Sequence, residues 1–181
     1  MNRRAVFLDR DGVINRSLIV EGKPVPPASL DELELLPGVP EALELLHAAG
    51  FLLIVITNQP DVARGKTARQ VVDEMNNQLL MSLPLAAVHT CYHDDADACT
   101  CRKPEPGLLL TAAIHYNLDL SGCYMVGDRW RDMEAGRRAG CRTLFIDYQY
   151  EEPRPELYDF SCGSLLDAAG FILAESSGLI L

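Results

Sequence analysis

Two aspartates, Asp9 and Asp11, are separated by one residue and follow a short apolar run at residues 5–8. A carboxylate can attack phosphorus and form an acyl phosphate, which divides one difficult displacement into two easier steps. In such a pair, one acid acts as the nucleophile and the other carries protons to and from the reacting oxygen. An Asp-Gly turn with solvated acids is the simpler explanation of Asp11 and Gly12 alone, so the chemistry depends on what else the chain supplies.

Asp128, which follows the apolar run at residues 123–126, supplies a further carboxylate. Magnesium takes oxygen ligands and commonly bridges one or two carboxylates to a substrate phosphate. Asp9 needs such a cation, because its own charge repels a phosphate dianion. We therefore predict a magnesium site that includes Asp9 and Asp128. Asp132 would lie one helical turn further on, either as a group that supports the metal ligands or as a charge at a helix N-terminus.

Three cysteines and one histidine fall within residues 91–101: Cys91, His93, Cys99 and Cys101. This set matches the Cys₃His composition of structural zinc sites, although the Cys-x-His and Cys-x-Cys spacings are tighter than in common zinc fingers. Four protein ligands leave no position for water or substrate, so we expect the zinc to be structural. Free thiols on an acidic loop are the alternative, and a catalytic cysteine would need an activating base that is not evident.

Cationic and hydroxyl groups that could hold a phosphate occur at Thr57, Arg102 and Lys103. Thr57 can donate a hydrogen bond, and Lys103 can neutralise phosphate oxygens. Arg102 follows the last zinc ligand directly, so a metal-bound loop would fix its guanidinium, which could bind phosphate or sugar oxygens in a bidentate manner.

Five apolar, β-rich segments alternate with stretches of helical spacing, which predicts a three-layer α/β/α sandwich, Rossmann-like, around a mainly parallel sheet. The expected strands lie at residues 5–8, 52–56, 87–92, 123–126 and 143–146, and the expected helices cover residues 39–46, 71–80 and 108–114. Because ligands bind outside the carboxyl ends of parallel strands, the polar residues after these strands should converge. The segment at residues 15–36 is a long loop, a feature typical of function.

Size and charge limit the classes of function. A chain of 181 residues with 48% hydrophobic residues is consistent with a single domain over residues 1–181. Its net charge of −10 argues against nucleic-acid or anionic-membrane binding. The N-terminal apolar run is too short for a signal peptide or a membrane span, so we expect a cytoplasmic protein. No sequence feature indicates the oligomeric state, and we expect a monomer.

The order of these motifs resembles the haloacid dehalogenase superfamily over residues 5–147. Asp-x-Asp comes first, then Thr-Asn after a strand, then Lys-Pro, then Gly-Asp-x-x-x-Asp. The dehalogenases of this superfamily lack the second acid, so the presence of Asp11 favours a phosphatase over a dehalogenase. The resemblance implies that Asp9 is the nucleophile, that Asp11 is the general acid and base, and that the magnesium ligands are Asp9, the backbone carbonyl of Asp11, and Asp128.

A narrower resemblance is to the branch that contains the D-glycero-D-manno-heptose 1,7-bisphosphate phosphatases and their near relatives, the histidinol-phosphate phosphatases. It rests on the segments 9–15, 57–59, 63–65 and 91–104. It implies a core without a large cap domain, Asn58 and Arg102 as substrate contacts, and removal of the 7-phosphate from a heptose bisphosphate.

The chain departs from this branch at Pro60 and Asp61, where Ser-Gly is common. Proline removes a backbone N–H, and an inward-pointing Asp61 would repel a second phosphate. Histidinol phosphate or another sugar phosphate is therefore the alternative substrate. A non-catalytic, zinc-stabilised binding module is the alternative of a different class.

Overall fold

A six-stranded parallel sheet forms the centre of the protein in the computed structural model, which describes residues 3–179. Residues 1–2 and 180–181, the latter part of the apolar C-terminal tail, lie outside this range. The strand order is β5-β4-β1-β6-β7-β8. The strands are β1 (Ala5–Leu8), β4 (Leu52–Asn58), β5 (Ala87–Cys91), β6 (Tyr124–Gly127), β7 (Arg142–Ile146) and β8 (Phe160–Cys162).

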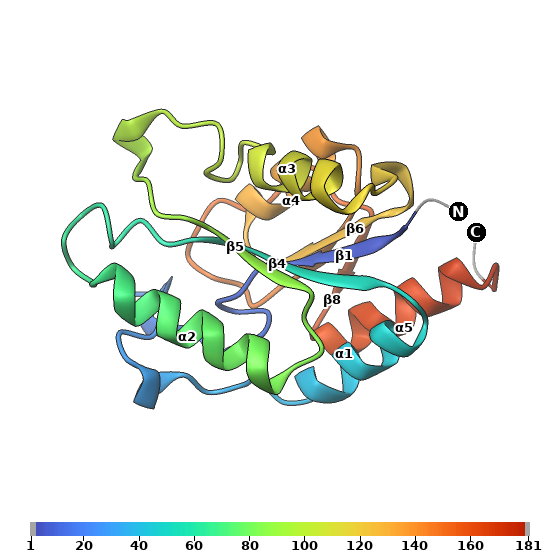
Figure 1. Ribbon diagram of the computed structural model, residues 1–181, viewed down its shortest axis with the longest axis horizontal. Helices are drawn as coiled ribbons and strands as arrows, with labels where there is room; N and C mark the ends of the chain where they lie inside the picture. Colours follow the sequence, from blue (N-terminus) through green and yellow to red (C-terminus); the bar gives the residue numbers. More distant parts are fainter. Residues whose placement is uncertain (1–2, 180–181) are drawn as a thin grey trace.

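Helices cover both faces of this sheet, as the sequence predicted (Figure 1). One face carries α3 (Gly107–Tyr116) and α4 (Trp130–Ala139), and the other carries α1 (Val39–Ala48), α2 (Arg69–Ser82) and α5 (Leu165–Ser176). Strand β1 shows why two helical layers are needed. Its residues are fully buried and alternate between the layers: Val6 and Leu8 join the core beneath α1 and α5, whereas Ala5 and Phe7 join the core beneath α3 and α4.

Helix α1 illustrates how local sequence sets an element. Gly38 adopts a φ of 77° at the N-cap, and a proline in the first turn suits the helix start because no N–H is needed there. The buried side chains recur at helical spacing, so one stripe faces the sheet: Val39, Ala42, Leu43 and Leu46.

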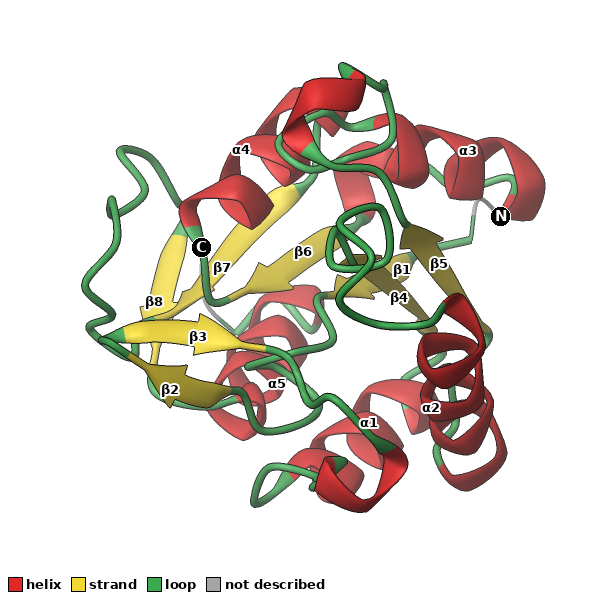
Figure 2. Ribbon diagram, turned by 90° about the vertical axis from the view of Figure 1, so that its left-hand side faces the viewer, coloured by secondary structure: helices red, strands yellow, loops and turns green. Residues whose placement is uncertain are grey.

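The long connection between β1 and α1, predicted as a loop over residues 15–36, contains short regular elements. It contains a two-stranded antiparallel hairpin, β2 (Leu18–Val20) and β3 (Lys23–Val25), and a short 3₁₀ turn, η1 (Leu30–Glu32). The hairpin stands apart from the main sheet (Figure 2). It lies between β1 and α1, and apart from η1 residues 9–38 hold no other helix or strand.

Two C-terminal elements were not predicted, β8 and α5. Strand β8 has three residues with a serine at its centre, so it lacks an apolar run, yet it pairs with β7 at the sheet edge.

No helix in residues 3–179 is long and apolar enough to cross a membrane.

Candidate active site

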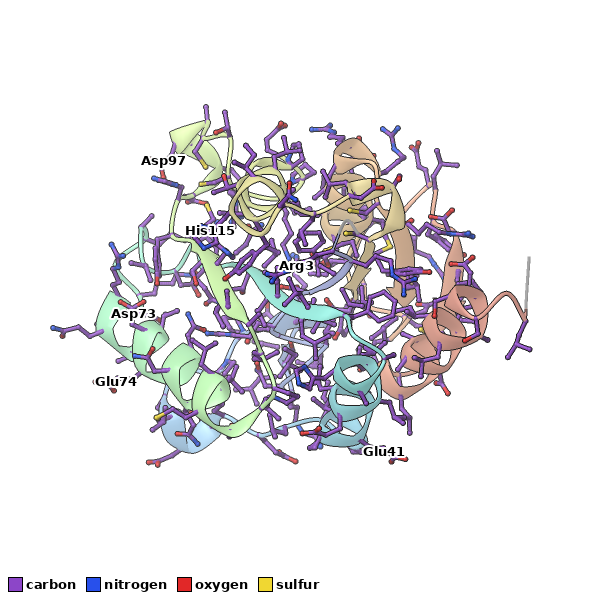
Figure 3. The ribbon with its side chains drawn as sticks, turned by 45° about the vertical axis from the view of Figure 1, so that its right-hand side comes forward. Arg3, Glu41, Asp73, Glu74, Asp97 and His115 are labelled. Atoms are coloured by element: carbon purple, nitrogen blue, oxygen red, sulfur yellow. The ribbon has the colours of Figure 1, made fainter. Side chains whose placement is uncertain are left out.

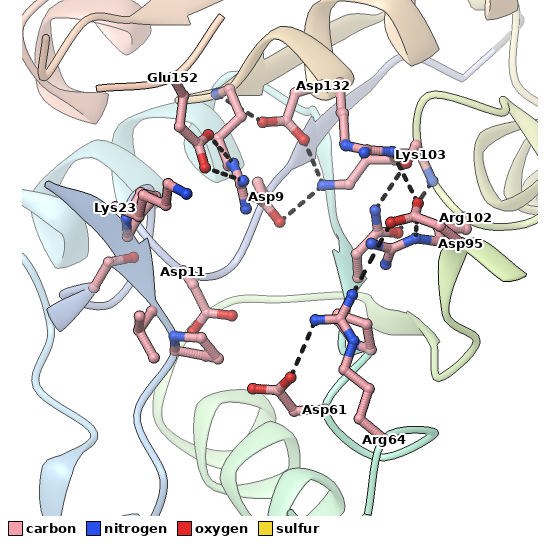
Figure 4. Close-up of a pocket in the computed structure, with 18 of the residues that line it drawn as sticks. Asp9, Asp11, Lys23, Asp61, Arg64, Asp95, Arg102, Lys103, Asp132 and Glu152 are labelled. Atoms are coloured by element: carbon pink, nitrogen blue, oxygen red, sulfur yellow. Dashed lines mark hydrogen bonds and ion pairs between the residues drawn. The ribbon is translucent and has the colours of Figure 1, made fainter. Parts of the chain in front are cut away.

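The predicted chemical residues meet at the carboxyl ends of three neighbouring strands. Asp9 follows β1, Asp128 follows β6, and Thr57 is the second-to-last residue of β4, which extends to Asn58 rather than ending at residue 56 as predicted. The chain continues from β1 to β4 on one side and later returns to β6 on the other, so Asp9 lies at the point where the strand order reverses. A cavity of about 370 Å³ opens here, and Asp9 and Asp11 both line it (Figure 4).

Lys103 is the central cation of this site. Its Nζ lies 2.8 Å from Asp9 Oδ1 and 2.6 Å from Asp132 Oδ1, and it donates to the Ile56 carbonyl at 2.7 Å. The Lys103 side chain is only 2% exposed. Burial opposes its charge, but Asp132 and Asp9 outweigh this effect and raise the pKa of Lys103. The ammonium group is therefore held charged against the Asp9 carboxylate.

Asn58 fixes the backbone of Lys103 from the neighbouring strand. Its Oδ1 accepts from the Lys103 N–H at 3.1 Å, and its Nδ2 donates to the Lys103 carbonyl at 3.0 Å. Both polar ends of the Asn58 amide are thus engaged, although the residue still lines the cavity. The sequence suggested Asn58 as a substrate contact; its clearest contacts in the structure are those that position Lys103.

Asp11 is oriented by three neighbours. Arg10, which is fully buried, donates from Nε and Nη2 to the carboxylate at 3.0–3.2 Å. Asn15 donates at 2.9 Å and Gln59 at 2.7 Å. Gln59 also donates to Thr57 Oγ1 at 2.9 Å. One amide therefore couples the predicted proton carrier to the predicted phosphate-binding hydroxyl.

Asp128 carries the strongest sign of a cation site. The residue is 2% exposed, and no hydrogen bond of good geometry reaches either carboxylate oxygen from the described residues, although the Tyr150 hydroxyl faces the carboxylate and partly lowers its pKa. Burial first, and then the charges of Asp9 and Asp132, raise its pKa well above the usual value. Burial likewise raises the pKa of Asp9 to about 6. Oxygens of Asp9, Asp128 and Asp132 lie within 4.8 Å of one another. This hard, anionic oxygen set fits Mg²⁺, which would offset the buried charge.

Gly12 makes room for that site. A Cβ at this position would lie 2.0 Å from Asp128 Oδ2, and the glycine φ of 89° is one that other residues rarely adopt. No side chain can therefore replace this hydrogen without displacing the Asp128 carboxylate.

Asp132 combines both roles that the sequence left open. Its Oδ1 holds Lys103, and its Oδ2 accepts from the Arg129 N–H at 3.0 Å, which caps the start of α4. The close approach of Asp132 to β6 requires Gly127, where a Cβ would lie 2.2 Å from the Asp132 Cβ. With both oxygens engaged by the protein, Asp132 is a group that supports the site.

The four predicted zinc ligands come together at the carboxyl end of β5. Asn58 pairs with Cys91 across the strands, so the loop begins directly beside the active site. Sulfur–sulfur distances of 3.2–3.7 Å join Cys91, Cys99 and Cys101, and His93 Nδ1 lies 3.3 Å from Cys101 Sγ. Tetrahedral zinc with bonds of about 2.3 Å to sulfur requires ligand separations of roughly 3.7 Å. The donor set therefore fits zinc with all four positions filled by protein. The loop lies across the sheet from α1, as the labelled Asp97 and Glu41 indicate (Figure 3).

The rim of the cavity contains Asp61, which the sequence marked as a source of repulsion. Arg64 Nη1 lies 3.3 Å from Asp61, and Lys66 Nζ lies 4.0 Å from the same oxygen. Arg64 also pairs with Asp94 of the zinc loop at 2.5 Å. The negative charge of Asp61 is thus offset by two cations. Arg102 lines the same cavity.

A known family, described as haloacid dehalogenase-like hydrolase, matches residues 25–140, which is more than half of the chain. The chain belongs to the haloacid dehalogenase-like hydrolase family. This haloacid dehalogenase-like hydrolase is also similar to named phosphatases. A D-glycero-beta-D-manno-heptose-1,7-bisphosphate 7-phosphatase from Pseudomonas aeruginosa is 36% identical over 151 residues, covering 81% of this chain and 82% of that protein. The Escherichia coli K12 enzyme of the same name is 36% identical over 156 residues, covering 78% of each chain.

Two solved structures of phosphatases are similar to this protein in both fold and sequence. The crystal structure of the D,D-heptose 1,7-bisphosphate phosphatase from B. bronchiseptica, complexed with magnesium and phosphate, superimposes with a TM-score of 0.80 at 30% identity, covering 96% of this chain and 99% of that chain. A putative HAD-like phosphatase from Mesorhizobium loti gives a TM-score of 0.72 at 28% identity, covering 94% and 88%.

Several residues that shape the site were not singled out from the sequence. Arg10 and Gln59 orient Asp11, Asn15 completes its partners, and Arg129 pairs with Glu152 of the loop after β7 at 2.5 Å. The sequence did offer a signal for Arg10, because a cation between two acids that share one site can pair with one of them and reduce their repulsion. Glu152 gave no signal, since its partner lies 23 positions away.

Proposed function

We propose that the protein is a magnesium-dependent phosphatase that removes the 7-phosphate of D-glycero-D-manno-heptose 1,7-bisphosphate through a phosphoryl group carried on Asp9. The observation that carries this proposal is the pairing of Asp9 with the buried Lys103 at 2.8 Å, beside the buried carboxylate of Asp128. One carboxylate is thereby offered to a phosphate next to a fixed positive charge and a site for a divalent cation. Family membership and the named relatives support the same class of reaction.

In the first step, an Asp9 oxygen attacks phosphorus and the bond from phosphorus to the sugar oxygen breaks. Asp11 donates its proton to that leaving oxygen, and in the second step it accepts a proton from the water that attacks the acyl phosphate. Phosphate leaves and the Asp9 carboxylate is regenerated. Lys103 and Thr57 bind the phosphate oxygens, and Asp9, the Asp11 carbonyl and Asp128 would hold Mg²⁺. When bound, Mg²⁺ supplies positive charge that offsets the repulsion between the nucleophile and the phosphate.

The surroundings of the site suit a small phosphorylated metabolite. A cavity of about 370 Å³ is within the size range of small-molecule sites. The net charge of −10 disfavours a nucleic-acid partner. The six cysteines are unpaired with one another, which is consistent with a reducing compartment and a zinc-bound loop. We infer a cytoplasmic, monomeric enzyme of one domain over residues 1–181.

The test is phosphate release from heptose 1,7-bisphosphate and from histidinol phosphate, measured in parallel with and without Mg²⁺. We expect Mg²⁺-dependent release from the bisphosphate at least 100-fold more efficiently than from histidinol phosphate, with the 1-phosphate retained in the product. Asp9→Asn should abolish release, whereas Asp31→Asn, at an exposed acid in η1, should not. Failure of the wild type to hydrolyse any of a broad phosphate panel would favour a non-catalytic module. Equal and feeble rates on both substrates would reject the heptose assignment.

A further inference from the structure

Two guanidinium groups meet on one carboxylate in the wall of the active-site cavity. Arg102 Nε donates to Asp95 Oδ1 at 2.9 Å, and Arg131 Nη1 donates to the same oxygen at 3.2 Å (Figure 4 shows Arg102 and Asp95). The two arginines come from separate segments, the end of the zinc loop and the first turn of α4. All three residues line the cavity that contains Asp9.

The position of this pair is fixed by residues at the reacting centre. Arg102 directly precedes Lys103, and Arg131 directly precedes Asp132. Lys103 and Asp132 are buried and lie 2.6 Å apart, so their neighbours are also held close together. Both arginines and Lys103 line the same cavity, so one ligand in this cavity can meet all three cations.

Three guanidinium groups face the acids of this wall. Arg102 and Arg131 share Asp95 Oδ1, and Arg64 lies 4.0 Å from the other oxygen of Asp95. Arg64 also pairs with Asp61 and Asp94. The charges of these three arginines and three aspartates balance, so a phosphate that replaced Asp95 would meet both guanidinium groups of the Arg102–Arg131 pair.

The shared carboxylate is also the most exposed member of this group. The Asp95 side chain is 55% exposed, whereas Arg102 is 11% exposed and Arg131 is 28% exposed. Arg131 is additionally held over the Trp130 ring, with its guanidinium carbon 4.8 Å from the ring centroid. Two largely buried guanidinium groups around a more exposed carboxylate form an arrangement in which a phosphate could bind in place of that carboxylate, through charge-assisted hydrogen bonds.

We propose that Arg131, together with Arg102, binds the phosphate of the substrate that is not hydrolysed, and that Asp95 is the internal carboxylate which this phosphate displaces. This inference rests on the proposed function, because it concerns the second anionic group of a bisphosphate. Arg131 then contributes to substrate binding, and Asp95 sets specificity by competing with the substrate. A substrate with a neutral or cationic tail leaves Asp95 in place and gains nothing from the pair.

The experiment compares kcat/KM for a bisphosphate with kcat/KM for the matching monophosphate, using heptose 1,7-bisphosphate with heptose 7-phosphate, and fructose 1,6-bisphosphate with fructose 6-phosphate. The ratio within each pair isolates the second phosphate from the chemical step. We expect Arg131→Ala to lower the ratio roughly 10-fold, which is the usual worth of a hydrogen bond to a charged group. Arg137→Ala, on the exposed side of the same helix and paired with Glu134, is the matched control.

Asp95→Asn should act in the opposite direction. Loss of the competing charge is expected to lower KM for the bisphosphate about threefold to tenfold. Glu105→Gln removes a charge from the same loop, at an acid that pairs with Arg138, and should leave KM as it is.

The two proposals fail in different ways. A wild-type enzyme that hydrolyses the fructose pair but neither heptose compound contradicts the heptose assignment, and the Arg131 and Asp95 variants still test the inference on the fructose pair. A wild-type ratio at or below one for every pair, or an unchanged ratio in Arg131→Ala, overturns the inference. A higher KM in Asp95→Asn would show that Asp95 positions the arginines and is not displaced, and would also reject it.

Discussion

Replacing Lys103 with methionine removes the one ammonium group that lies between two buried carboxylates. The side chains of Lys103 and Asp132 are each 2% exposed and that of Asp9 is 11% exposed, so solvent cannot compensate for the lost charge. Methionine retains most of the volume, which keeps the packing nearly unchanged. The perturbation is therefore almost purely electrostatic.

Breaking a buried ion pair by removing one partner costs about 3–5 kcal/mol, because the remaining charge stays buried without compensation. Lys103→Met should lower the free energy of unfolding by this amount. For a chain of this length, each kcal/mol lowers Tm by roughly 2–4 °C, so we expect a decrease of about 6–20 °C. Activity should fall at least 100-fold, since a fixed charge at the phosphate is lost.

Urea unfolding, measured without Mg²⁺ and at equal zinc content, is the assay. Lys66→Met is the matched control for stability, because Lys66 is 67% exposed and should change the free energy of unfolding by less than about 0.5 kcal/mol. In Lys103→Met, the carboxylates of Asp9 and Asp132 are left buried without their shared cation. Adding Asp132→Asn removes one of these two negative charges and should restore part of the stability but none of the activity. A Lys103→Met protein within about 1 kcal/mol of wild type would refute this electrostatic account.

Three further predictions concern the metal sites and the core. Gly12→Ala should place a methyl group on the Asp128 carboxylate, so Mg²⁺ activation should be lost while far-UV circular dichroism stays native; normal activation would refute the close approach. Wild type should contain one zinc per chain, and Cys101→Ala should lose zinc and unfold at lower temperature; full stability without zinc would contradict a structural metal. Burial, and then the hydrogen bond to Glu175, raises the pKa of Tyr124 to about 12. The stabilisation from this raised pKa is complete below the unfolded pKa near 10 and is lost as pH rises through about 12. Tyr124→Phe should therefore lower the free energy of unfolding by about 1 kcal/mol at pH 8. Between pH 9 and 12, urea titrations should show a smaller loss of stability in Tyr124→Phe than in wild type.

Elements with strong local signals were predicted well. Helix α1 and the buried strands have apolar spacing that matches their period, and the structure contains them with ends shifted by a few residues. Strand β8 and helix α5 were missed for different reasons. The first has three residues and depends on pairing with β7, and the second was overlooked although Ser164 and Asp167 cap its start.

The interpretation of Pro60 and Asp61 changed once the structure was available. The sequence indicated an acid that could repel a second phosphate, and the structure shows that Arg64 and Lys66 offset this charge. Such compensation depends on how the loop folds back on itself, and the residue types alone do not reveal it.

The sequence alone predicted the groups that carry the proposed chemistry. Asp9, Asp11, Thr57 and Asp128 each follow or end a strand, and parallel strands end at the same edge of a sheet, so their convergence follows from the pattern. The zinc ligands lie within one short loop, which makes them equally predictable. Only the tertiary structure decided how these groups are paired.

The contacts of Lys103 with Asp132, of Asn58 with the Lys103 backbone, and of Asp95 with Arg131 each join residues that are 29 to 45 positions apart. Their geometry is set by the strand order and by the backbone path of the zinc loop. A side chain's partner across such a distance is chosen by packing, and local residue patterns carry no information about it.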